Sequence, residues 1–121
     1  MKKTVIIGAS PNPSRYSYMA AEMLVRYNHE FVPVGVKKGE LFGKQILSIH
    51  ERPIITDVDT ITLYIGPLHQ TEWYDYLMDI KPKRIIFNPG AENDELSALS
   101  ANNKIENLEA CTLVMLATGQ Y

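Results

Sequence analysis

Short continuous hydrophobic runs alternate along the chain with stretches in which apolar residues recur at helical spacing. The first run is Thr4 to Ile7, followed by Gly8; a β-branched run of this kind is typical of a strand buried on both faces of a parallel sheet. Apolar residues then recur every three or four positions over residues 14–28, which predicts an amphipathic helix. A second strand is predicted over residues 31–34, where Pro33 indicates a strand end or a place near the sheet edge.

The same alternation returns after residues 37–59, an irregular segment in which we expect one short strand at about 45–47. The later elements are predicted in turn as strand 60–65, helix 70–80, strand 84–87, helix 92–102 and strand 105–110. Alternating strands and helices imply right-handed crossovers between parallel strands. We therefore expect one domain over residues 1–121, with an α/β fold in which a doubly wound parallel sheet lies between two helical layers. The apolar segment 112–116 should add a helix or contact a second copy of the chain in a homo-oligomer.

Composition narrows the classes of partner. The chain has 121 residues, of which 45% are hydrophobic, enough for one globular core. A net charge of −2 gives no overall attraction to nucleic acid or to an anionic membrane, and we expect neither partner. No apolar run approaches the roughly 20 residues that cross a bilayer. The lone Cys111 and the lack of a secretory signal pattern predict a reducing, cytoplasmic location.

The loop that leaves the first strand carries the pattern of an anion site. In a doubly wound sheet, ligands bind outside the carboxyl ends of the strands. The segment Gly8–Arg15 opens a predicted helix there with small residues, so backbone N–H groups and the positive helix end favour a phosphate. The hydroxyls of Ser10, Ser14 and Ser17 could donate to phosphate oxygens, and the Arg15 guanidinium could bind them in a bidentate way. Alternatively, Ser14 only caps the helix, the prolines only form turns, and Arg15 is a solvated surface residue.

Two features of the sequence argue against an ordinary NAD site. The dinucleotide fingerprint needs further glycines where Ser10 and Pro13 stand. An acidic residue that binds the ribose is expected after the second strand, where the chain has Gly35-Val36-Lys37-Lys38 instead. Two lysines favour an additional phosphate on the adenosine ribose, which both NADP and coenzyme A carry, although a solvated lysine pair is an equal alternative.

Loops after the later strands reach the same edge of the sheet. Ile65-Gly66-Pro67 and Asn88-Pro89-Gly90 bring small and rigid residues there, so that the backbone could closely approach an adenine or a pantetheine arm. Such loops also occur wherever a helix must be separated from a strand. Cys111 follows the last predicted strand and could lie near a thiol or thioester, but a buried inert cysteine is the commoner case.

This series of motifs resembles the CoA-binding domain family, which is similar to the nucleotide-binding domain of succinyl-CoA synthetase α-subunits. The resemblance runs in order over nearly the whole chain and rests on the following segments: Gly8-Ala9-Ser10 with Pro13, Arg15 and Ser17; Val32-Pro33-Val34; Leu41-Phe42-Gly43; Ile65-Gly66-Pro67; Asn88-Pro89-Gly90-Ala91; and Cys111. Two positions depart from the family pattern. Gly35-Val36 stands where the family often has Asn-Pro, and Asn88 stands where it often has Gln.

The resemblance implies a Rossmann-like domain whose first loop and second strand end hold the nucleotide part of coenzyme A. The residues that we expect to bind coenzyme A or an acyl-CoA are Gly8, Ala9, Ser10, Asn12, Pro13, Arg15, Ser17, Pro33, Val34, Gly35, Lys37, Lys38, Ile65, Gly66, Pro67, Asn88, Pro89 and Gly90.

Catalytic chemistry is not predicted. In the synthetases that the domain resembles, the phosphorylated histidine lies on a separate domain. His29, His50 and His69 have no nucleophile partner at a recognisable spacing, so we expect surface or capping roles for them. No cluster suggests a metal site. The leading interpretation is therefore a small stand-alone binding protein for coenzyme A; the alternatives are an NADP-linked oxidoreductase and a regulatory interaction module with a nucleotide pocket.

Overall fold

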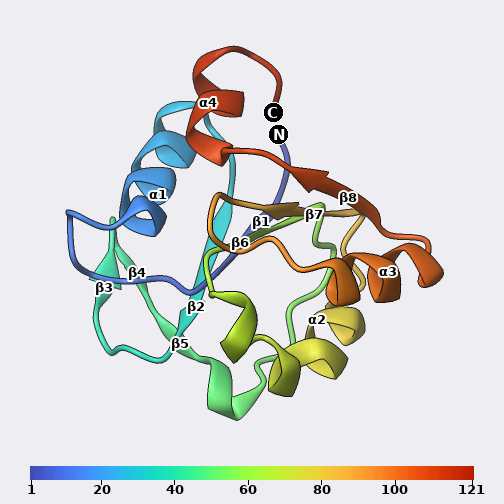
Figure 1. The fold of residues 1–121 in the computed structure, drawn as a ribbon. Coiled ribbons are helices and arrows are strands. Elements are labelled where there is room, and N and C mark those ends of the chain that lie inside the picture. Colours follow the sequence, from blue (N-terminus) through green and yellow to red (C-terminus); the bar gives the residue numbers. More distant parts are fainter.

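A computed structural model describes all residues from Met1 to Tyr121 and shows one six-stranded sheet in which every strand pair is parallel (Figure 1). The strand order is β5-β2-β1-β6-β7-β8. The chain thus builds outward from β1 in one direction, returns to the other side of β1, and continues outward in the opposite direction. The bounds are β1 (Thr4–Ile7), β2 (Phe31–Gly35), β5 (Leu47–Ser48), β6 (Thr60–Leu63), β7 (Arg84–Phe87) and β8 (Glu106–Glu109).

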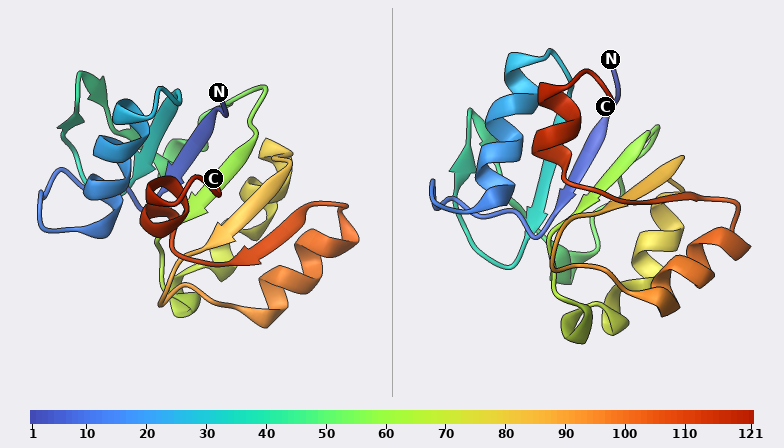
Figure 2. Two further views of the ribbon diagram at one scale, coloured as in Figure 1. Left: turned by 90° about the horizontal axis from the view of Figure 1, so that it is seen from above. Right: turned by 45° about the horizontal axis from the view of Figure 1, so that its top comes forward.

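Helices cover both faces of this sheet, which confirms the expected three-layer, doubly wound architecture. One face carries α1 (Tyr16–Arg26) and α4 (Thr112–Ala117), and the other carries α2 (Tyr74–Ile80) and α3 (Asp94–Asn102), as the two views of Figure 2 show. Three single 3-10 turns connect the elements: η1 (Ile49–Glu51), η2 (Pro67–His69) and η3 (Thr71–Trp73). The strand order is that of a Rossmann fold with its reversal point between β1 and β6.

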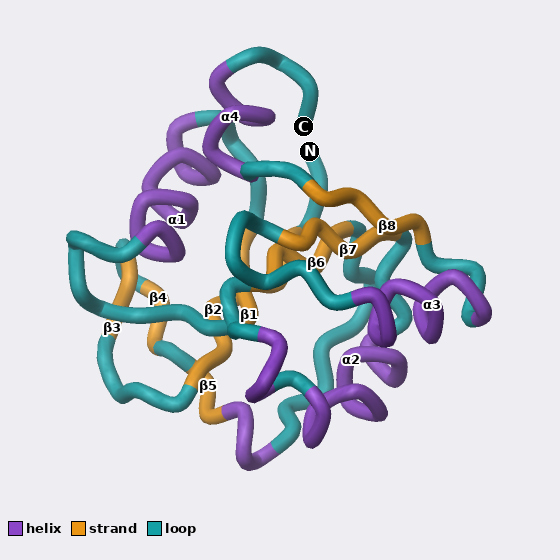
Figure 3. The backbone as a smooth tube through the Cα atoms, viewed as in Figure 1, coloured by secondary structure: helices purple, strands orange, loops and turns teal.

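The irregular segment contains more structure than we expected. In place of one short strand, β4 (Lys44–Gln45) pairs antiparallel with β3 (Glu40–Leu41), and β5 follows one residue later and joins the main sheet (Figure 3). Since β5 pairs only with the last two residues of β2, Pro33 itself faces no partner on that side. This agrees with the prediction that the proline lies near an edge.

Alternation along the central strand divides the core in two. Val5 and Ile7 face the layer of α2 and α3, whereas Ile6 faces α1, and all three are fully buried. The larger cluster also contains Trp73, and the smaller one contains Leu24 of α1. A continuous apolar run in β1 therefore satisfies both faces at once.

The C-terminal segment folds back over the sheet. α4 packs against α1 through Leu116, and the last residue, Tyr121, reaches the beginnings of the strands. There the Arg84 guanidinium lies 4.5 Å from the Tyr121 ring centroid, and its Nε donates to Thr60 Oγ1 at 2.7 Å. Burial raises the pKa of Tyr121 above its ordinary value, so that its hydroxyl stays neutral. These contacts place the tail at the sheet edge opposite the loops that follow the strands.

No helix in the structure combines the length and the apolar character needed to span a bilayer.

Replacing Leu24 with alanine should lower the free energy of unfolding by about 2–5 kcal/mol, because the side chain is fully buried between α1 and the sheet. The matched control is Val25→Ala on the next residue, whose side chain is 48% exposed and should change stability by less than about 0.5 kcal/mol. Urea unfolding measures both values. Equal losses for the two variants would contradict this assignment of the helix faces.

Candidate functional site

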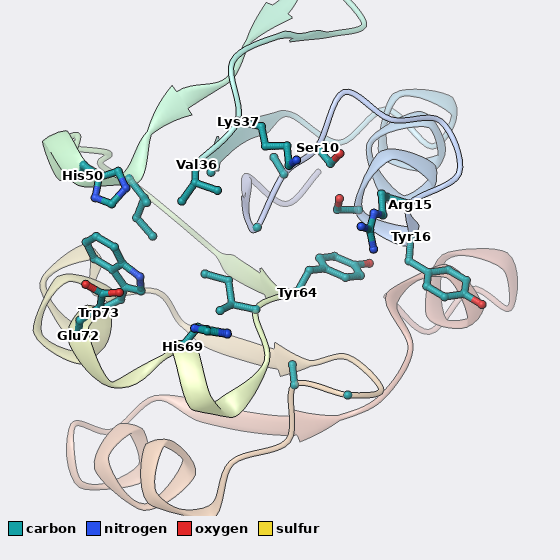
Figure 4. A pocket seen from close by; sticks show the side chains of 18 of the residues that line it. Ser10, Arg15, Tyr16, Val36, Lys37, His50, Tyr64, His69, Glu72 and Trp73 are labelled. Atoms are coloured by element: carbon teal, nitrogen blue, oxygen red, sulfur yellow. The ribbon is translucent and has the colours of Figure 1, made fainter.

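A cleft of about 540 Å³ opens at the carboxyl ends of the strands, where the strand order reverses (Figure 4). Its walls come from the loops after β1, β2, β6 and β7, together with the first turn of α1 and residues of η1, η2 and η3. This is the position at which open α/β sheets bind their ligands. The lining residues are Gly8, Ala9, Ser10, Arg15, Tyr16, Ser17, Gly35, Val36, Lys37, Ile49, His50, Tyr64, Ile65, His69, Glu72, Trp73, Pro89, Gly90 and Ala91.

The loop after β1 is held firmly in place. The N–H groups of Gly8 and Ala9 both donate to the carbonyl oxygen of Val34, at 2.9 and 3.0 Å. Gly8 has a φ of +94°, a conformation that favours glycine. Further along, Asn12 Oδ1 accepts hydrogen bonds from both the N–H and the hydroxyl of Ser14. The loop thus has its own internal hydrogen bonds, which fix its shape before any ligand arrives.

Helix α1 begins at the wall of the cleft without a side-chain cap. Arg15 occupies the N-cap position and makes no capping hydrogen bond. The N–H groups of Ser10, Tyr16 and Ser17 donate to no other group of the protein. Helix α3 is different, since Asn93 Oδ1 accepts from the N–H groups of the two residues Glu95 and Leu96. An anion in the cleft could accept from the free donors of α1, and the helix dipole would favour it.

The end of β2 approaches the first loop closely at Gly35. A Cβ atom on Gly35 would lie 2.6 Å from the carbonyl oxygen of Ala9, which is too near for any side chain. The expected family pattern has a larger residue here, so the departure has a structural reason in this chain. It lets the backbone of β2 contact the first loop directly.

The two ends of the cleft differ in chemistry, as Figure 4 shows. Arg15 and Lys37 supply positive charge near α1 and after β2. At the other end His50 lies edge-on to Trp73, with ring centroids 5.4 Å apart, and Glu72 lies beside them. Trp73 is only 6% exposed, so the cleft reaches it as part of a buried wall.

Tyr64 lies between these ends, directly after β6. Its side chain extends toward the α1 side of the cleft in Figure 4. Its hydroxyl is buried and has no hydrogen-bond partner. Burial raises the pKa of Tyr64 to about 12, so the phenol remains neutral at physiological pH. It therefore contributes no charge to the cleft.

Ten of the eighteen residues that we expected to bind the ligand come together in this cleft. They are Gly8, Ala9, Ser10, Arg15, Ser17, Gly35, Lys37, Ile65, Pro89 and Gly90.

The other eight do not line the cleft: Asn12, Pro13, Pro33, Val34, Lys38, Gly66, Pro67 and Asn88. Val34 is fully buried in the core, and Asn12 braces the first loop. Asn88 is 2% exposed and joins β7 to its neighbours: its amide nitrogen donates to Thr62 Oγ1 at 2.8 Å, and its amide oxygen accepts from the N–H of Thr112 at 2.9 Å. The structure thus gives Asn88 hydrogen bonds that connect the strands to α4.

Sequence reasoning missed nine residues of the cleft: Tyr16, Val36, Ile49, His50, Tyr64, His69, Glu72, Trp73 and Ala91. Tyr64 and Ala91 adjoin loops that we did select, so the end of a predicted strand was a usable signal for them. His50 and His69 are exposed, as expected for surface residues, but both also face the cleft.

His29 lies away from the cleft, where its Nδ1 accepts from the N–H of Lys2 at 2.9 Å. Burial lowers the pKa of His29 below its ordinary value.

A family model described as "CoA binding domain" matches residues 2–117. The chain belongs to the CoA-binding domain family. This confirms the resemblance derived from the motifs, whereas the further likeness to succinyl-CoA synthetase α-subunits stays a prediction. Among curated proteins, none matches the chain significantly.

Solved structures share the fold of this CoA-binding domain. A crystal structure described only as an uncharacterized protein is 55% identical, with a TM-score of 0.97, and the match covers 100% of this chain and 98% of that one. A conserved hypothetical protein from Pyrococcus furiosus is 25% identical, with a TM-score of 0.79 and coverage of 94% and 98%. A hypothetical protein from Pyrococcus horikoshii OT3 is 20% identical, with a TM-score of 0.83 and coverage of 97% and 82%. These likenesses support the fold and carry no statement about activity.

Replacing Gly35 with alanine should displace the first loop, because the new Cβ would lie 2.6 Å from the backbone oxygen of Ala9. A backbone atom cannot rotate away as the end of a flexible side chain could. We expect a loss of about 1–3 kcal/mol in the free energy of unfolding. The control is Gly66→Ala, since no atom lies within 4 Å of a Cβ there and Gly66 has an ordinary φ of −63°. Chemical denaturation measures both, and a Gly35→Ala protein as stable as the control would refute the close approach.

Proposed function

We propose that this domain is a stand-alone binding protein for coenzyme A or an acyl derivative, and that it holds the nucleotide part of that ligand in the cleft. The observation that carries the proposal is the uncapped N-terminus of α1 at the cleft wall. Free backbone donors, a helix dipole and a neighbouring guanidinium together favour a pyrophosphate at this point. Membership of the CoA-binding domain family supports coenzyme A as the molecule that brings it.

The pyrophosphate would lie against the first turn of α1. The N–H groups of Ser10, Tyr16 and Ser17 are available to donate, because no protein carbonyl uses them. The Ser17 side chain lines the cleft and is nearly buried, so its hydroxyl would add a donor in a partly dehydrated place. Arg15 is exposed at the rim, where its guanidinium would neutralise part of the ligand charge.

The phosphate on the ribose would lie near Lys37. This residue follows β2 directly and lines the cleft, whereas Lys38 lies outside it. An acidic residue directly after β2 would repel a ribose phosphate, and residues 36–38 contain no acidic residue. One lysine of the pair therefore suffices for the proposal, and the other is a solvated surface residue.

The pantetheine arm would leave the pyrophosphate toward the loop after β7. Pro89, Gly90 and Ala91 form that part of the wall. Gly90 has no atom within 4 Å of a Cβ position, so the space above its backbone is open. Cys111 does not line the cleft, and we assign it no part in binding.

We propose binding without catalysis, because the groups placed around the phosphates are suited to holding an anion. Backbone N–H groups, a serine hydroxyl, a guanidinium and an ammonium stabilise negative charge without transferring a proton at neutral pH. Tyr64, one of the two tyrosines that line the cleft, is held neutral by burial, which raises its pKa to about 12.

Isothermal titration calorimetry should show saturable binding of coenzyme A to the wild-type chain. The Arg15→Ala variant should bind about 5- to 20-fold more weakly, because an exposed charge-assisted contact is lost. Arg26→Ala is the matched control, since Arg26 is the exposed basic residue in the last turn of the same helix and does not line the cleft. It should leave the affinity within about twofold.

NADP serves as the competing ligand in the same titration, because it also carries a ribose phosphate. Binding of NADP with higher affinity than coenzyme A would replace the proposed function with a dinucleotide-linked one. No heat and no thermal shift with coenzyme A, together with no effect of Arg15→Ala, would overturn it altogether.

A further inference from the structure

Glu72 is the one acidic side chain among the residues that line the cleft. The charged groups nearer α1 are the cations Arg15 and Lys37. A carboxylate weakens the binding of a polyanion unless it lies away from the phosphates or accepts a hydrogen bond from the ligand. A ligand that fills the cleft should therefore present a hydrogen-bond donor to the Glu72 carboxylate.

Three landmarks give the direction of the ligand along the cleft. The N-terminus of α1 marks the pyrophosphate, and Lys37 after β2 marks the ribose phosphate, both as argued above. Beyond Lys37 the cleft continues to His50 of η1 and to Trp73, as Figure 4 shows. The group attached to the ribose on that side is the base, so the base would reach the end of the cleft that contains Glu72.

Hydrogen bonds of the buried Gln70 side chain hold the backbone that carries Glu72 in place. Gln70 is fully buried, and its amide nitrogen donates to the carbonyl oxygens of Ile65 at 2.7 Å and Ala91 at 2.8 Å. These bonds tie the turn between η2 and η3 to the loops after β6 and β7. The carbonyl oxygen of Glu72 also accepts from Arg52 Nη2 at 3.4 Å. Glu72 thus projects from a fixed backbone, while its exposed side chain remains free to meet a ligand.

The chemistry of the bases makes a choice possible. Adenine carries an amino group at position 6, which donates, and an ionised carboxylate only accepts. Hypoxanthine carries a carbonyl oxygen at the same position, which would repel the carboxylate. The imidazole of His50 meets the indole of Trp73 edge-on, with an angle of 65° between the ring planes, so the two rings form an angled aromatic wall beside this point.

We propose that Glu72 makes the cleft selective for adenine by accepting a hydrogen bond from the 6-amino group of the base, which lies against the wall formed by Trp73 and His50. This inference rests on the proposed binding of coenzyme A and adds the residue that reads the base.

The test compares coenzyme A with its analogue in which the adenine is deaminated to hypoxanthine. Trp73 is the only tryptophan of the chain, so intrinsic fluorescence follows binding at this end of the cleft, and calorimetry supplies an independent dissociation constant. The wild-type chain should prefer coenzyme A over the analogue by at least about fivefold, the scale of one charged hydrogen bond at an exposed site.

The Glu72→Gln variant should reduce this preference to within about twofold, because a glutamine amide can present either its oxygen or its NH₂ group to the base. Glu51→Gln is the matched control. Glu51 is an exposed carboxylate on the neighbouring η1 turn that does not line the cleft, so its variant removes the same charge and should keep the wild-type preference.

Each outcome is decisive. A wild-type chain that binds both ligands equally, a Glu72→Gln variant that keeps the preference, or an equal loss of preference in Glu51→Gln would overturn the role of Glu72 while leaving coenzyme A binding intact. A wild-type chain that binds neither ligand would overturn the proposed function and this inference together. Circular dichroism confirms that both variants remain folded.

Discussion

Two hydrogen bonds to a single carbonyl oxygen hold the functional edge of this domain together. The N–H groups of Gly8 and Ala9 both donate to Val34, so the chain leaving β1 must turn across the end of β2. That turn brings Ala9 so close to Gly35 that only a glycine fits there. The chain continues from this turn into α1, whose unpaired N–H groups lie at the wall of the cleft.

Helices α1 and α3 differ in how their N-termini are completed. Helix α3 is capped by Asn93, whose amide nitrogen also donates to Gln70 and to Tyr74, so its N-terminus is completed by the protein itself. Helix α1 lacks such a cap and opens into the cleft. Since an uncapped helix costs stability that a cap would supply, the site at α1 is the place where a bound anion would also stabilise the fold.

The two ends of the cleft suit two parts of one ligand. Positive charge and backbone donors at one end match phosphates, while an aromatic pair with a nearby carboxylate at the other end matches a base that donates a hydrogen bond. The buried Gln70 connects these regions by holding the turn that carries Glu72 against the loops after β6 and β7. In the proposed complex, the positions of the base and of the pantetheine arm would therefore both depend on Gln70.

The sequence by itself determined the α/β architecture, the family and the first loop. Continuous β-branched runs such as the one in β1 are local signals, because burial on both faces requires every position to be apolar. Motif positions such as Gly8 and Arg15 follow from where a strand ends and a helix begins. The far end of the cleft could not be predicted this way, since η1 and η3 are separated by about twenty residues and carry no periodic signal.

Only the tertiary structure decided that His50, Glu72 and Trp73 share one wall, and that Asn88 holds α4 instead of facing the cleft. Both arrangements depend on contacts between segments that lie far apart in the sequence, and a local pattern of residues carries no information about such contacts.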